Sequence, residues 1–482
     1  MEKEKFYVTT PIYYVNARPH IGHAYTTIAA DILARFYRLK GVNTFFSTGT
    51  DEHGIKIEKK AGEAGQKPKD FADVIAEEFK KAWHLANISY DGFIRTTEEE
   101  HKLAVQKALQ FMYDKGDIYL DKYSGLYCQG CEQFKNEKDL IDGKCPDHQT
   151  VPEEMSEETY VFRMSKYADE ILRRIEKDEF KISPAERKNE ILGFFKEGIK
   201  DVSFSRQNIK WGIPLPWDAS HTAYVWSDAF LNYLTVLGWD GMAGIDSDDE
   251  KSAVNFWPPK IQLMSKDILR VHATIWPAML LSLELPLPKE LFVHGFFQIN
   301  GQKMSKSLGN VISPNDLCAR YGVDGARYLL MSATVFGRDG DISLEKFDAK
   351  YQADLANGFG NLVARTSNLL EKNSIETDLK INSDQELSDR FSHELSAYRF
   401  DEALNILWAR LREMDEFISA KAPWKIKDKQ EIADVLIVVA QNILNVAHLV
   451  QPFMPEVGLR VVSQFSEKQI KKGESLFPRL DA

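Results

Sequence analysis

Residues 6–47 read FYVTTPIYYVNARPHIGHAYTTIAADILARFYRLKGVNTFFS, and the changing hydrophobic period along them decides the fold. The first ten are rich in Val, Thr, Ile and Tyr, which predicts a buried strand. Apolar side chains then recur at i+4 spacing and predict a helix over 23–40, ended by Gly41; they are Ala24, Ile28, Ile32 and Phe36. A second strand is predicted at 42–47. Strand, helix and adjacent strand form a βαβ unit, which predicts a parallel sheet with a right-handed crossover.

The rest of the chain divides into units by the pattern of its segments. Helices are predicted at 68–86 and 98–115, and turn residues with short mixed segments indicate an inserted module at 117–216. The α/β pattern resumes near Thr222 and continues through 261–264 and 291–293. Beyond about Phe347 only helices are predicted, at 354–371, 384–398, 401–421 and 431–449. The predicted fold class is α/β: a doubly wound (Rossmann-like) parallel sheet (1–116 and 217–346), an insertion (117–216) and an all-α bundle (347–482).

The overall charge and the cysteines limit the classes of function. The net charge of −11 at pH 7 argues against binding nucleic acid by bulk charge, so any such site is a local patch. Four cysteines are too few for a disulfide framework and favour metal binding in a reducing compartment. We see no apolar run of membrane-spanning length, and charged residues follow Met1 where a signal peptide would have its apolar core. We therefore expect a cytoplasmic protein that binds no membrane.

Three of the cysteines have the spacing of a zinc knuckle. Cys128 and Cys131 form one pair, and Cys145 with His148 forms a second pair thirteen residues later. Three thiolates and one imidazole complete a tetrahedral Zn²⁺ site with no position left for water, so the site is predicted to be structural. The alternative is three reduced cysteines and an unrelated histidine. Cys318 stands alone and is predicted to be a small buried side chain.

Two short segments have the composition of phosphate-binding sites. His20-Ile21-Gly22-His23 falls where the first strand passes into its helix, and a helix N-terminus favours anions. The alternative is that the two histidines merely cap the helix. Lys303-Met304-Ser305-Lys306-Ser307 lies in a Gly- and Ser-rich stretch, where two lysines suit a clamp on a triphosphate. The alternative there is an ordinary exposed basic loop.

Together, and in this order, the two segments are the HIGH and KMSKS signatures, so the chain resembles the class I aminoacyl-tRNA synthetases. Five further segments are similar to the methionine-specific members of that family, and the resemblance covers nearly the whole chain; they are residues 11–16 (PIYYVN), 48–54 (TGTDEHG), 224–229 (YVWSDA), 266–268 (KDI) and 276–279 (WPAM). Two positions depart from the family pattern. Ser265 stands where Gly is common, and Phe230 stands where an aliphatic residue or proline is usual.

The resemblance implies ATP-dependent activation of L-methionine as an adenylate, with release of pyrophosphate and transfer to the 3′ end of tRNA(Met), initiator tRNA included. Neither step needs a protein nucleophile, because catalysis rests on positioning and charge stabilisation. Mg²⁺ is expected with ATP, bound mainly through the phosphates. The implied catalytic residues are His20, His23, Lys303 and Lys306. The implied ATP contacts are Gly22, Asp267, His294, Gly295, Ser305 and Ser307.

The family's amino-acid site is apolar and aromatic, with one acid for the substrate ammonium. Matched by position, Asp51 and the backbone of Ile12 would hold that ammonium. The side chains implied around the thioether are Tyr14, Trp226, Ala229, Tyr233, Ile268 and His272. Methionine offers only a weak sulfur acceptor, so recognition must rest on shape, sulfur–aromatic contact and a donor such as the Tyr14 hydroxyl or a ring N–H of His272. The alternative for the aromatic residues is ordinary core packing.

The helical bundle would serve the tRNA. Asn361 and Arg365 lie one turn apart on a predicted helix, and a pair at this place reads anticodon bases in the family. The alternative is a solvated polar face. The aromatic residue that the family stacks on the anticodon is left unassigned near residues 448–453. The resemblance divides the chain into a split catalytic domain, a zinc-bearing connective insertion and an anticodon-binding domain, expected as a monomer.

Three other functions remain open from the sequence alone. The first is a sister enzyme for another amino acid, although 482 residues leave no room for the long editing insertion of the branched-aliphatic enzymes. The second is a catalytically silent tRNA-binding protein, which the intact HIGH, KMSKS and Asp51 oppose. The third is a zinc-bearing nucleotidyltransferase that ignores tRNA, which Asn361 and Arg365 oppose.

Overall fold

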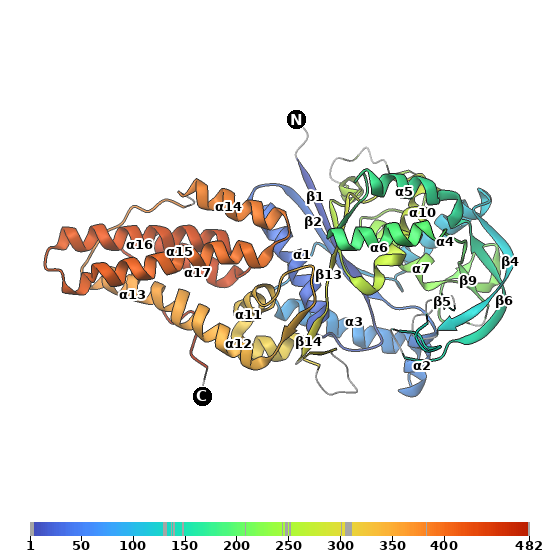
Figure 1. Ribbon diagram of the computed structural model, residues 1–482, viewed down its shortest axis with the longest axis horizontal. Helices are drawn as coiled ribbons and strands as arrows, with labels where there is room; N and C mark the ends of the chain where they lie inside the picture. The colour runs from blue at the N-terminus through green and yellow to red at the C-terminus, as the bar shows by residue number, and fades with distance from the viewer. Residues whose placement is uncertain are drawn as a thin grey trace.

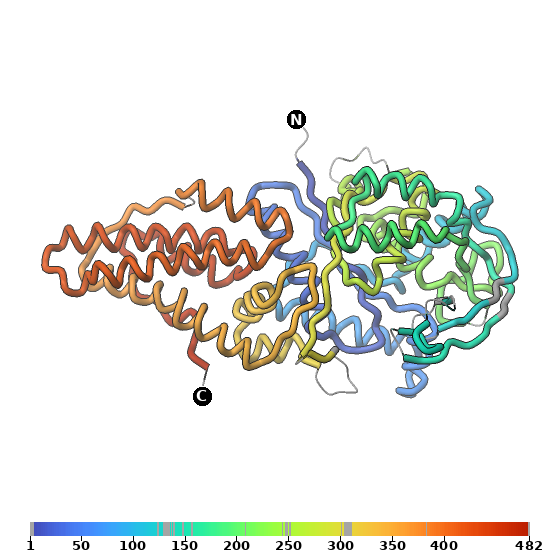
Figure 2. Tube along the Cα trace, viewed as in Figure 1, coloured from blue at the N-terminus to red at the C-terminus, as the bar shows by residue number. Residues whose placement is uncertain are grey.

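The computed structural model describes most of the 482 residues. It leaves out 1–3, 129–132, 136, 138–139, 147–148, 208, 243, 246–248, 250–251, 300, 304–310, 382 and 481–482. The described chain forms a central α/β region, an antiparallel β region on one side and a long helical lobe on the other (Figure 1). Figure 2 shows the helical lobe, in orange and red, extending away from the sheet. The N-terminal part of the chain, in blue, lies beside the lobe only at the end of the lobe that faces the sheet.

The central sheet is parallel and has the order β3-β2-β1-β12-β13-β7. Its strands are β1 (Lys5–Tyr14), β2 (Asn43–Asp51), β3 (Gly92–Arg95), β7 (Lys181–Ser183), β12 (Ile261–Ser265) and β13 (Glu290–His294). α1 (Ile21–Leu39) connects β1 to β2, and Gly41, at φ +76°, lies just after the end of the helix, so the predicted βαβ unit is confirmed. The order reverses between β1 and β12, where doubly wound sheets bind their ligands.

Helices pack on the sheet through the apolar faces that the sequence indicates. The predicted helices are present as α3 (Pro68–Leu85) and α4 (Glu99–Asp114). The remaining helices of this region are α2 (Ile55–Glu63), α5 (Ala168–Glu176), α6 (Ala185–Lys196), α7 (Val225–Ala229), α8 (Asn232–Thr235), α9 (Leu269–Ala273) and α10 (Ile275–Ser282). Short elements such as α7 to α9 escape periodicity analysis because they complete too few turns to show a repeat.

The segment predicted as an insertion contains one small antiparallel sheet and two strands of a second one, whose central strand lies just beyond residue 216. One has the order β5-β4-β6-β8, with β4 (Ile118–Cys128), β5 (Gln133–Lys135), β6 (Glu153–Phe162) and β8 (Val202–Ser203). The other has the order β10-β11-β9, with β9 (Ser205–Arg206), β10 (Pro214–Leu215) and β11 (Asp218–Ala223). Within the same segment, β7 pairs with β13 and completes the edge of the central sheet. Its three residues are too few to be recognised as a sheet strand from sequence.

Beyond β13 a small sheet leads into the helical lobe. Its strands are β14 (Phe297–Ile299), β15 (Gln302–Lys303) and β16 (Gly340–Ile342), and α11 (Pro314–Ser332) runs between the last two. The lobe comprises α12 (Leu344–Lys350), a π-helix (Tyr351–Phe359), α13 (Gly360–Lys372), α14 (Gln385–Ser396), α15 (Phe400–Lys421), α16 (Lys429–Val450) and α17 (Pro455–Phe465). The four predicted helices are therefore present, and α17 is an addition.

One helix among the described residues, α16, is long and apolar enough to cross a membrane by length and composition alone. By that criterion, the expectation that the chain has no apolar run of this length is wrong. The helix is nevertheless 67% buried over its apolar window, and it packs against α13, α15 and α17. This burial is typical of the core helix of a bundle.

Candidate functional site

The predicted site segments gather at the carboxyl ends of the parallel strands. His20–His23 follow β1, and Lys266–Ile268 follow β12, its neighbour in the sheet. Asp51 ends β2, on the other side of β1. The reversal of strand order between β1 and β12 therefore brings segments from far apart in the chain to one crevice.

His20 and His23 cap α1 together. The Nδ1 of His20 accepts the backbone N–H of Gly22, and the Nδ1 of His23 accepts that of His20, both at 3.1 Å. The two rings stack with centroids 3.8 Å apart. Capping is thus part of their role, but it uses only the Nδ1 atoms. A neutral ring whose Nδ1 accepts carries its proton on Nε2, so each histidine has an Nε2–H donor suited to an anion.

His294 is placed differently from the other predicted ATP contacts. Its ring is buried, with Nε2 2.6 Å from the Thr26 hydroxyl and Nδ1 2.8 Å from the Gly295 carbonyl oxygen. Because a carbonyl can only accept, Nδ1 donates and Nε2 accepts from Thr26. A Cβ on Gly295 would lie 2.2 Å from the Arg338 carbonyl carbon, which explains the glycine by packing. Both ring nitrogens of His294 thus already have partners within the protein, and the ATP contact expected of this residue stays a prediction.

The KMSKS segment begins in the β14–β15 hairpin. The side chain of Lys303, and Ser305, Lys306 and Ser307 entirely, lie outside the described residues. The chain re-enters the described region just before Ile312, whose carbonyl oxygen accepts the N–H of Ile21 at 3.0 Å. The exit of this segment is therefore hydrogen-bonded to the first residue of α1.

Two residues at and after the end of β12, Ser265 and Lys266, each bind a carboxylate. The Ser265 hydroxyl donates to Asp267, so the serine that departs from the family pattern binds a predicted ATP contact. The Lys266 ammonium pairs with Asp339 at 2.7 Å and lies 4.9 Å from the centre of the Phe296 ring. Lys266 is thereby held toward the small sheet that carries the KMSKS segment.

Asp51, Ile12 and Tyr14 lie at one corner of the crevice. The register of β1 and β2 pairs Tyr14 with Asp51 and Ile12 with Gly49. Asp51 is only 8% exposed, so its charge lies in a largely dehydrated place. A Cβ on Gly49 would lie 2.2 Å from the Ile94 carbonyl oxygen, so glycine is needed for the close approach of β3.

An aromatic cluster lies on and beside α7, α9 and α10, and α7 is hydrogen-bonded through Asp228 to His53, two residues after Asp51. Trp226 stacks on Phe230 at 5.2 Å, and the His272 ring stands edge-on to Phe230 at 4.9 Å. Trp276 stacks on the other side of Phe230 at 5.6 Å. The indole N–H of Trp226 is buried without a hydrogen-bond partner in the described part of the chain. Phe230, which departs from the family pattern, thus forms the centre of the cluster, and Trp226 is a donor that the sequence analysis did not identify.

His272 and Tyr233 are joined in a hydrogen-bonded chain. The His272 Nδ1 lies 2.9 Å from the Ile268 carbonyl oxygen, and its Nε2 lies 2.9 Å from the Tyr233 hydroxyl. Nδ1 therefore donates to the carbonyl, and Nε2 accepts from Tyr233. Burial lowers the pKa of His272 to about 4, so the ring is neutral at pH 7. With its one N–H bound to Ile268, His272 is not the donor to sulfur that the sequence suggested.

Asp228 forms a buried cluster that the sequence analysis did not identify. Its carboxylate contacts the His53 Nδ1 at 2.6 Å and the His101 Nε2 at 2.8 Å, and the His101 Nδ1 contacts Thr235 at 2.7 Å. Burial by itself would raise the pKa of Asp228, but the two histidines lower it to about 2. The cluster ties the residues after Asp51 to the helix that carries Trp226. Asp228 lies within YVWSDA, and an acid in such an apolar segment could have indicated from the sequence that a buried carboxylate needs partners here.

The two described cysteines of the knuckle are both buried beside Thr150. The Cys128 Sγ lies 3.9 Å from the Thr150 hydroxyl, and the Cys145 N–H donates to the Thr150 carbonyl oxygen at 2.8 Å. Cys131 and His148 lie outside the described residues. No group of three metal-binding side chains occurs among the residues that the structure does describe.

On the helical lobe, Asn361 is exposed and Arg365 is partly buried one turn away on α13. Arg365 pairs with Asp415 at 2.6 Å and lies 6.0 Å from the Trp424 ring, which is 49% exposed. The region that the sequence analysis left open for an aromatic contact is different, since Phe453 there is fully buried. Trp424 is thus the exposed aromatic side chain beside the predicted pair.

Acidification is expected to destabilise the protein through two buried histidines. Burial lowers the pKa of both His272 and His294 from 6.5 to about 4. Below pH 6.5 the unfolded chain binds protons that the folded chain does not, so stability falls with pH until about 4. At pH 5 each histidine should cost about 2 kcal/mol relative to pH 7.5.

Melting temperatures at pH 7.5 and 5 check this expectation. The drop should be smaller by about 2 °C in His294→Gln, and should equal that of the wild type in the exposed control His84→Gln. An equal drop in all three proteins would contradict the assignment.

The chain is similar to known proteins over its whole length. A family model described as tRNA synthetases class I (M) matches residues 6–154 and 136–367. The methionine–tRNA ligase of Clostridium acetobutylicum is 42% identical, and that of Bacillus subtilis 38%; each match covers 100% of this chain and 79% of the relative. The Mycobacterium tuberculosis methionyl-tRNA synthetase in complex with methionyl-adenylate superposes with a TM-score of 0.91 at 35% identity, covering 99% of this chain and 100% of that chain.

Proposed function

This chain belongs to the methionine-specific class I aminoacyl-tRNA synthetases and ligates methionine to tRNA with consumption of ATP, and from that premise we propose roles for its residues. In the first step the methionine carboxylate attacks the α-phosphorus of ATP and pyrophosphate leaves. In the second, a hydroxyl of the tRNA 3′ end attacks the adenylate carbonyl and AMP leaves. The shared activity of the relatives decides against a sister enzyme, a silent binder and a tRNA-independent transferase.

The phosphates are assigned to the N-terminus of α1. Gly22 leaves space for the nucleotide, and His20 and His23 present their Nε2–H groups to the oxygens that gain charge in the first step. Because the helix cap already holds these donors in place, they can stabilise the charge without a rearrangement of the protein, which supports the assignment. We propose that Lys303, Ser305, Lys306 and Ser307 also bind the phosphates and that Asp267 contacts ATP. Mg²⁺ would accompany ATP and neutralise part of its charge, bound through the phosphates.

Methionine is assigned to the corner between Asp51 and the aromatic cluster. The Asp51 carboxylate and the Ile12 carbonyl would bind the ammonium. The thioether would lie against Tyr14, Trp226, Ala229, Tyr233, Ile268 and His272. The observation that carries the proposal is the adjacency of a buried acid, an aromatic cluster and a histidine-capped helix N-terminus at one reversal of strand order.

The experiment that tests these assignments is ATP–pyrophosphate exchange with each of the twenty amino acids, for the wild type and for Lys306→Ala. Exchange with methionine alone, lowered by orders of magnitude in the variant, would support both the substrate site and the clamp. Exchange that is equal in the two proteins would overturn the clamp, and exchange centred on another amino acid would overturn the methionine pocket.

We propose that Cys128, Cys131, Cys145 and His148 bind one structural Zn²⁺ in a connective insertion at 117–216. The burial of Cys128 and Cys145 around one residue, Thr150, fits two thiolate ligands of a closed site. The metal would hold together a loop region that has little apolar core of its own.

Metal analysis of the purified chain tests the zinc site. The wild type should contain about one zinc per chain, and Cys145→Ser should lose nearly all of it. The control is Cys318→Ser, because burial raises the pKa of Cys318 to about 11 and leaves a protonated thiol that is a poor ligand. Equal zinc in the wild type and Cys145→Ser would contradict the site.

The helical lobe, residues 347–482, is proposed to bind the anticodon of tRNA(Met), initiator tRNA included. Asn361 and Arg365 supply polar groups for base edges, and the exposed Trp424 offers a face on which a base can stack. We further propose that residues 1–116 and 217–346 form the catalytic domain, to whose sheet the insertion contributes β7, and that the protein acts as a monomer in the cytoplasm.

A further inference from the structure

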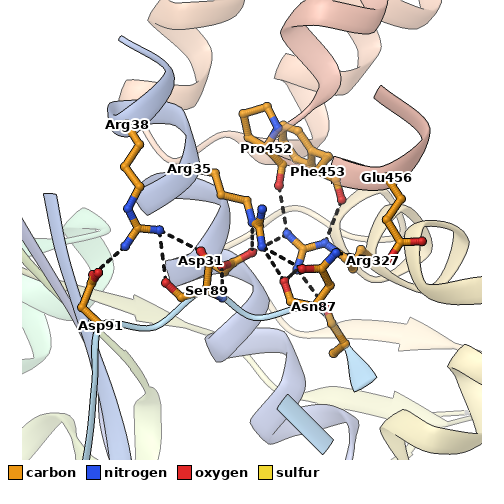
Figure 3. Close-up of polar contacts among 11 residues, drawn as sticks. Asp31, Arg35, Arg38, Asn87, Ser89, Asp91, Arg327, Pro452, Phe453 and Glu456 are labelled. Atoms are coloured by element: carbon orange, nitrogen blue, oxygen red, sulfur yellow. Dashed lines mark hydrogen bonds and ion pairs between the residues drawn. The ribbon is translucent and has the colours of Figure 1, made fainter. Parts of the chain in front are cut away.

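A fully buried arginine joins the helical lobe to the sheet. Arg327 of α11 is 0% exposed. Its Nε donates to the Phe453 carbonyl at 2.9 Å, and its Nη2 donates to the Pro452 carbonyl at 2.9 Å and to Asp31 at 2.6 Å. Its Nη1 donates to the carbonyls of Ala86 at 3.1 Å and Asn87 at 3.4 Å. All five N–H groups are thus used on three separate segments (Figure 3).

The carboxylate of Asp31 is the other half of this cluster. Its Oδ2 accepts from Arg327 and from the Arg35 Nε at 2.7 Å, and its Oδ1 accepts from the backbone N–H and hydroxyl of Ser89. Burial alone would raise its pKa, but Arg327, Arg35 and the Ser89 hydrogen bonds hold the pKa below its usual value. The pair is therefore ionised and saturated with partners, which fixes its geometry more than it adds stability.

Two further contacts cross the same junction. The Asp324 carboxylate accepts the N–H of Val457 at 2.6 Å, and the Asn87 side-chain amide donates to Glu456 at 3.2 Å. Pro452 and Phe453 lie in the turn between α16 and α17, and Glu456 and Val457 lie in the first turn of α17. One end of the helical lobe is thus fixed to α11 and to the segment after α3.

The helices that meet at this junction are those that lead to the site. Asp31 lies on α1, roughly 15 Å from Ile21 at 1.5 Å per residue. Arg327 lies on α11, which begins just after the KMSKS segment. At the other end of the same pair, the Ile21 N–H donates to the Ile312 carbonyl. α1 is therefore joined at its first residue to the segment just before α11, and at Asp31 in its middle to the part of α11 that follows the kink at Gly322.

We propose that Arg327 and Asp31 are positioning residues for the transfer step, because they fix the direction of the helical lobe relative to the site. The inference rests on the proposed binding of tRNA by the lobe. α16 alone is about 33 Å long, so a tilt of about 5° at the junction moves its far end by about 3 Å. Misplacement of about 1 Å can cost about 100-fold in rate, so a tRNA held at the lobe needs a rigid junction. Methionine activation uses no group on the lobe and therefore does not need the rigid junction.

Arg327→Lys tests the junction, since lysine keeps the charge near Asp31 but cannot reach three segments with a planar fork. The matched control is Arg320→Lys on the same helix, where the arginine is partly exposed and pairs with Asp348. Three quantities are measured: methionine-dependent pyrophosphate exchange, the Kd for tRNA, and the single-turnover rate of methionine transfer from adenylate to bound tRNA.

For Arg327→Lys we expect transfer about 10-fold slower, with exchange and Kd within about threefold of wild type, and no change in the control. Equal losses in exchange and transfer, or transfer at the wild-type rate, would overturn the proposal. If Arg327→Lys does not fold, Asp324→Ala removes the contacts of that carboxylate to the backbone of Val457 and Glu456 and leaves the pair of Arg327 and Asp31 in place. Burial raises the pKa of Asp324 to about 6, so this loss is tolerable, and a transfer defect of about threefold with normal exchange is expected. Transfer at the wild-type rate in Asp324→Ala would overturn the junction.

The tRNA-binding role of the lobe is checked separately with Arg365→Ala. An unchanged Kd for tRNA in that variant would remove the premise about the lobe, whereas a weaker Kd keeps the premise and leaves the Arg327 result to decide on the junction.

Discussion

Asp51→Asn is expected to lower kcat/KM for methionine in pyrophosphate exchange by about 100-fold or more. The carboxylate is nearly buried at the end of β2, so little water lies near it to weaken its attraction for a substrate ammonium. Removing one partner of such a pair costs roughly 2–5 kcal/mol, and about 3 kcal/mol corresponds to roughly 100-fold. Asparagine keeps the shape of the side chain and removes the charge.

The way in which the Asp51→Asn loss divides between kcat and KM tests the proposed role of Asp51. The ammonium is bound in the ground state as well as in the transition state, so most of the loss should appear in KM. The control is Asp70→Asn, an exposed acid in the first turn of α3, which should behave as wild type. A loss below about fivefold in a folded Asp51→Asn protein would place the ammonium elsewhere.

His20→Asn is expected to lower kcat for methionine activation by about 100-fold with little change in KM for methionine. Asparagine is a favourable N-cap, and its side-chain oxygen can accept the Gly22 N–H as Nδ1 now does. The substitution therefore keeps the helix cap but removes the Nε2–H donor, together with the ring that stacks on His23. Loss of one preorganised donor to a developing charge commonly costs about 100- to 1,000-fold.

Comparison with His20→Ala separates capping from catalysis. Alanine loses the cap as well, so it should match asparagine in kcat but lower the stability by a further ~1 kcal/mol. Melting temperature and exchange kinetics on the two variants provide the test. If His20→Asn retained wild-type kcat, capping would be the whole role of His20, and the phosphate assignment would fail.

Site residues could be predicted from the sequence where their partners are close in the chain, and could not where the partners are distant. His20 and Gly22 act within a few residues of each other, so the start of a helix after a strand was visible in the sequence. His272 and His294 have partners on other elements, namely Tyr233 and Thr26. Their hydrogen bonds occupy both nitrogens of each ring, and no local pattern could reveal this.

The sequence by itself determined the parallel α/β unit, the helical C-terminal region and the family. These features depend on hydrophobic period, on turn residues such as Gly41 and on short contiguous motifs, which are local properties of the chain. Only the tertiary structure decided that β7 completes the central sheet, that Asp228 collects His53 and His101, and that Arg327 binds three distant segments. Each of these is a contact between residues far apart in the chain, and a buried polar group takes its role from the partners that folding brings to it.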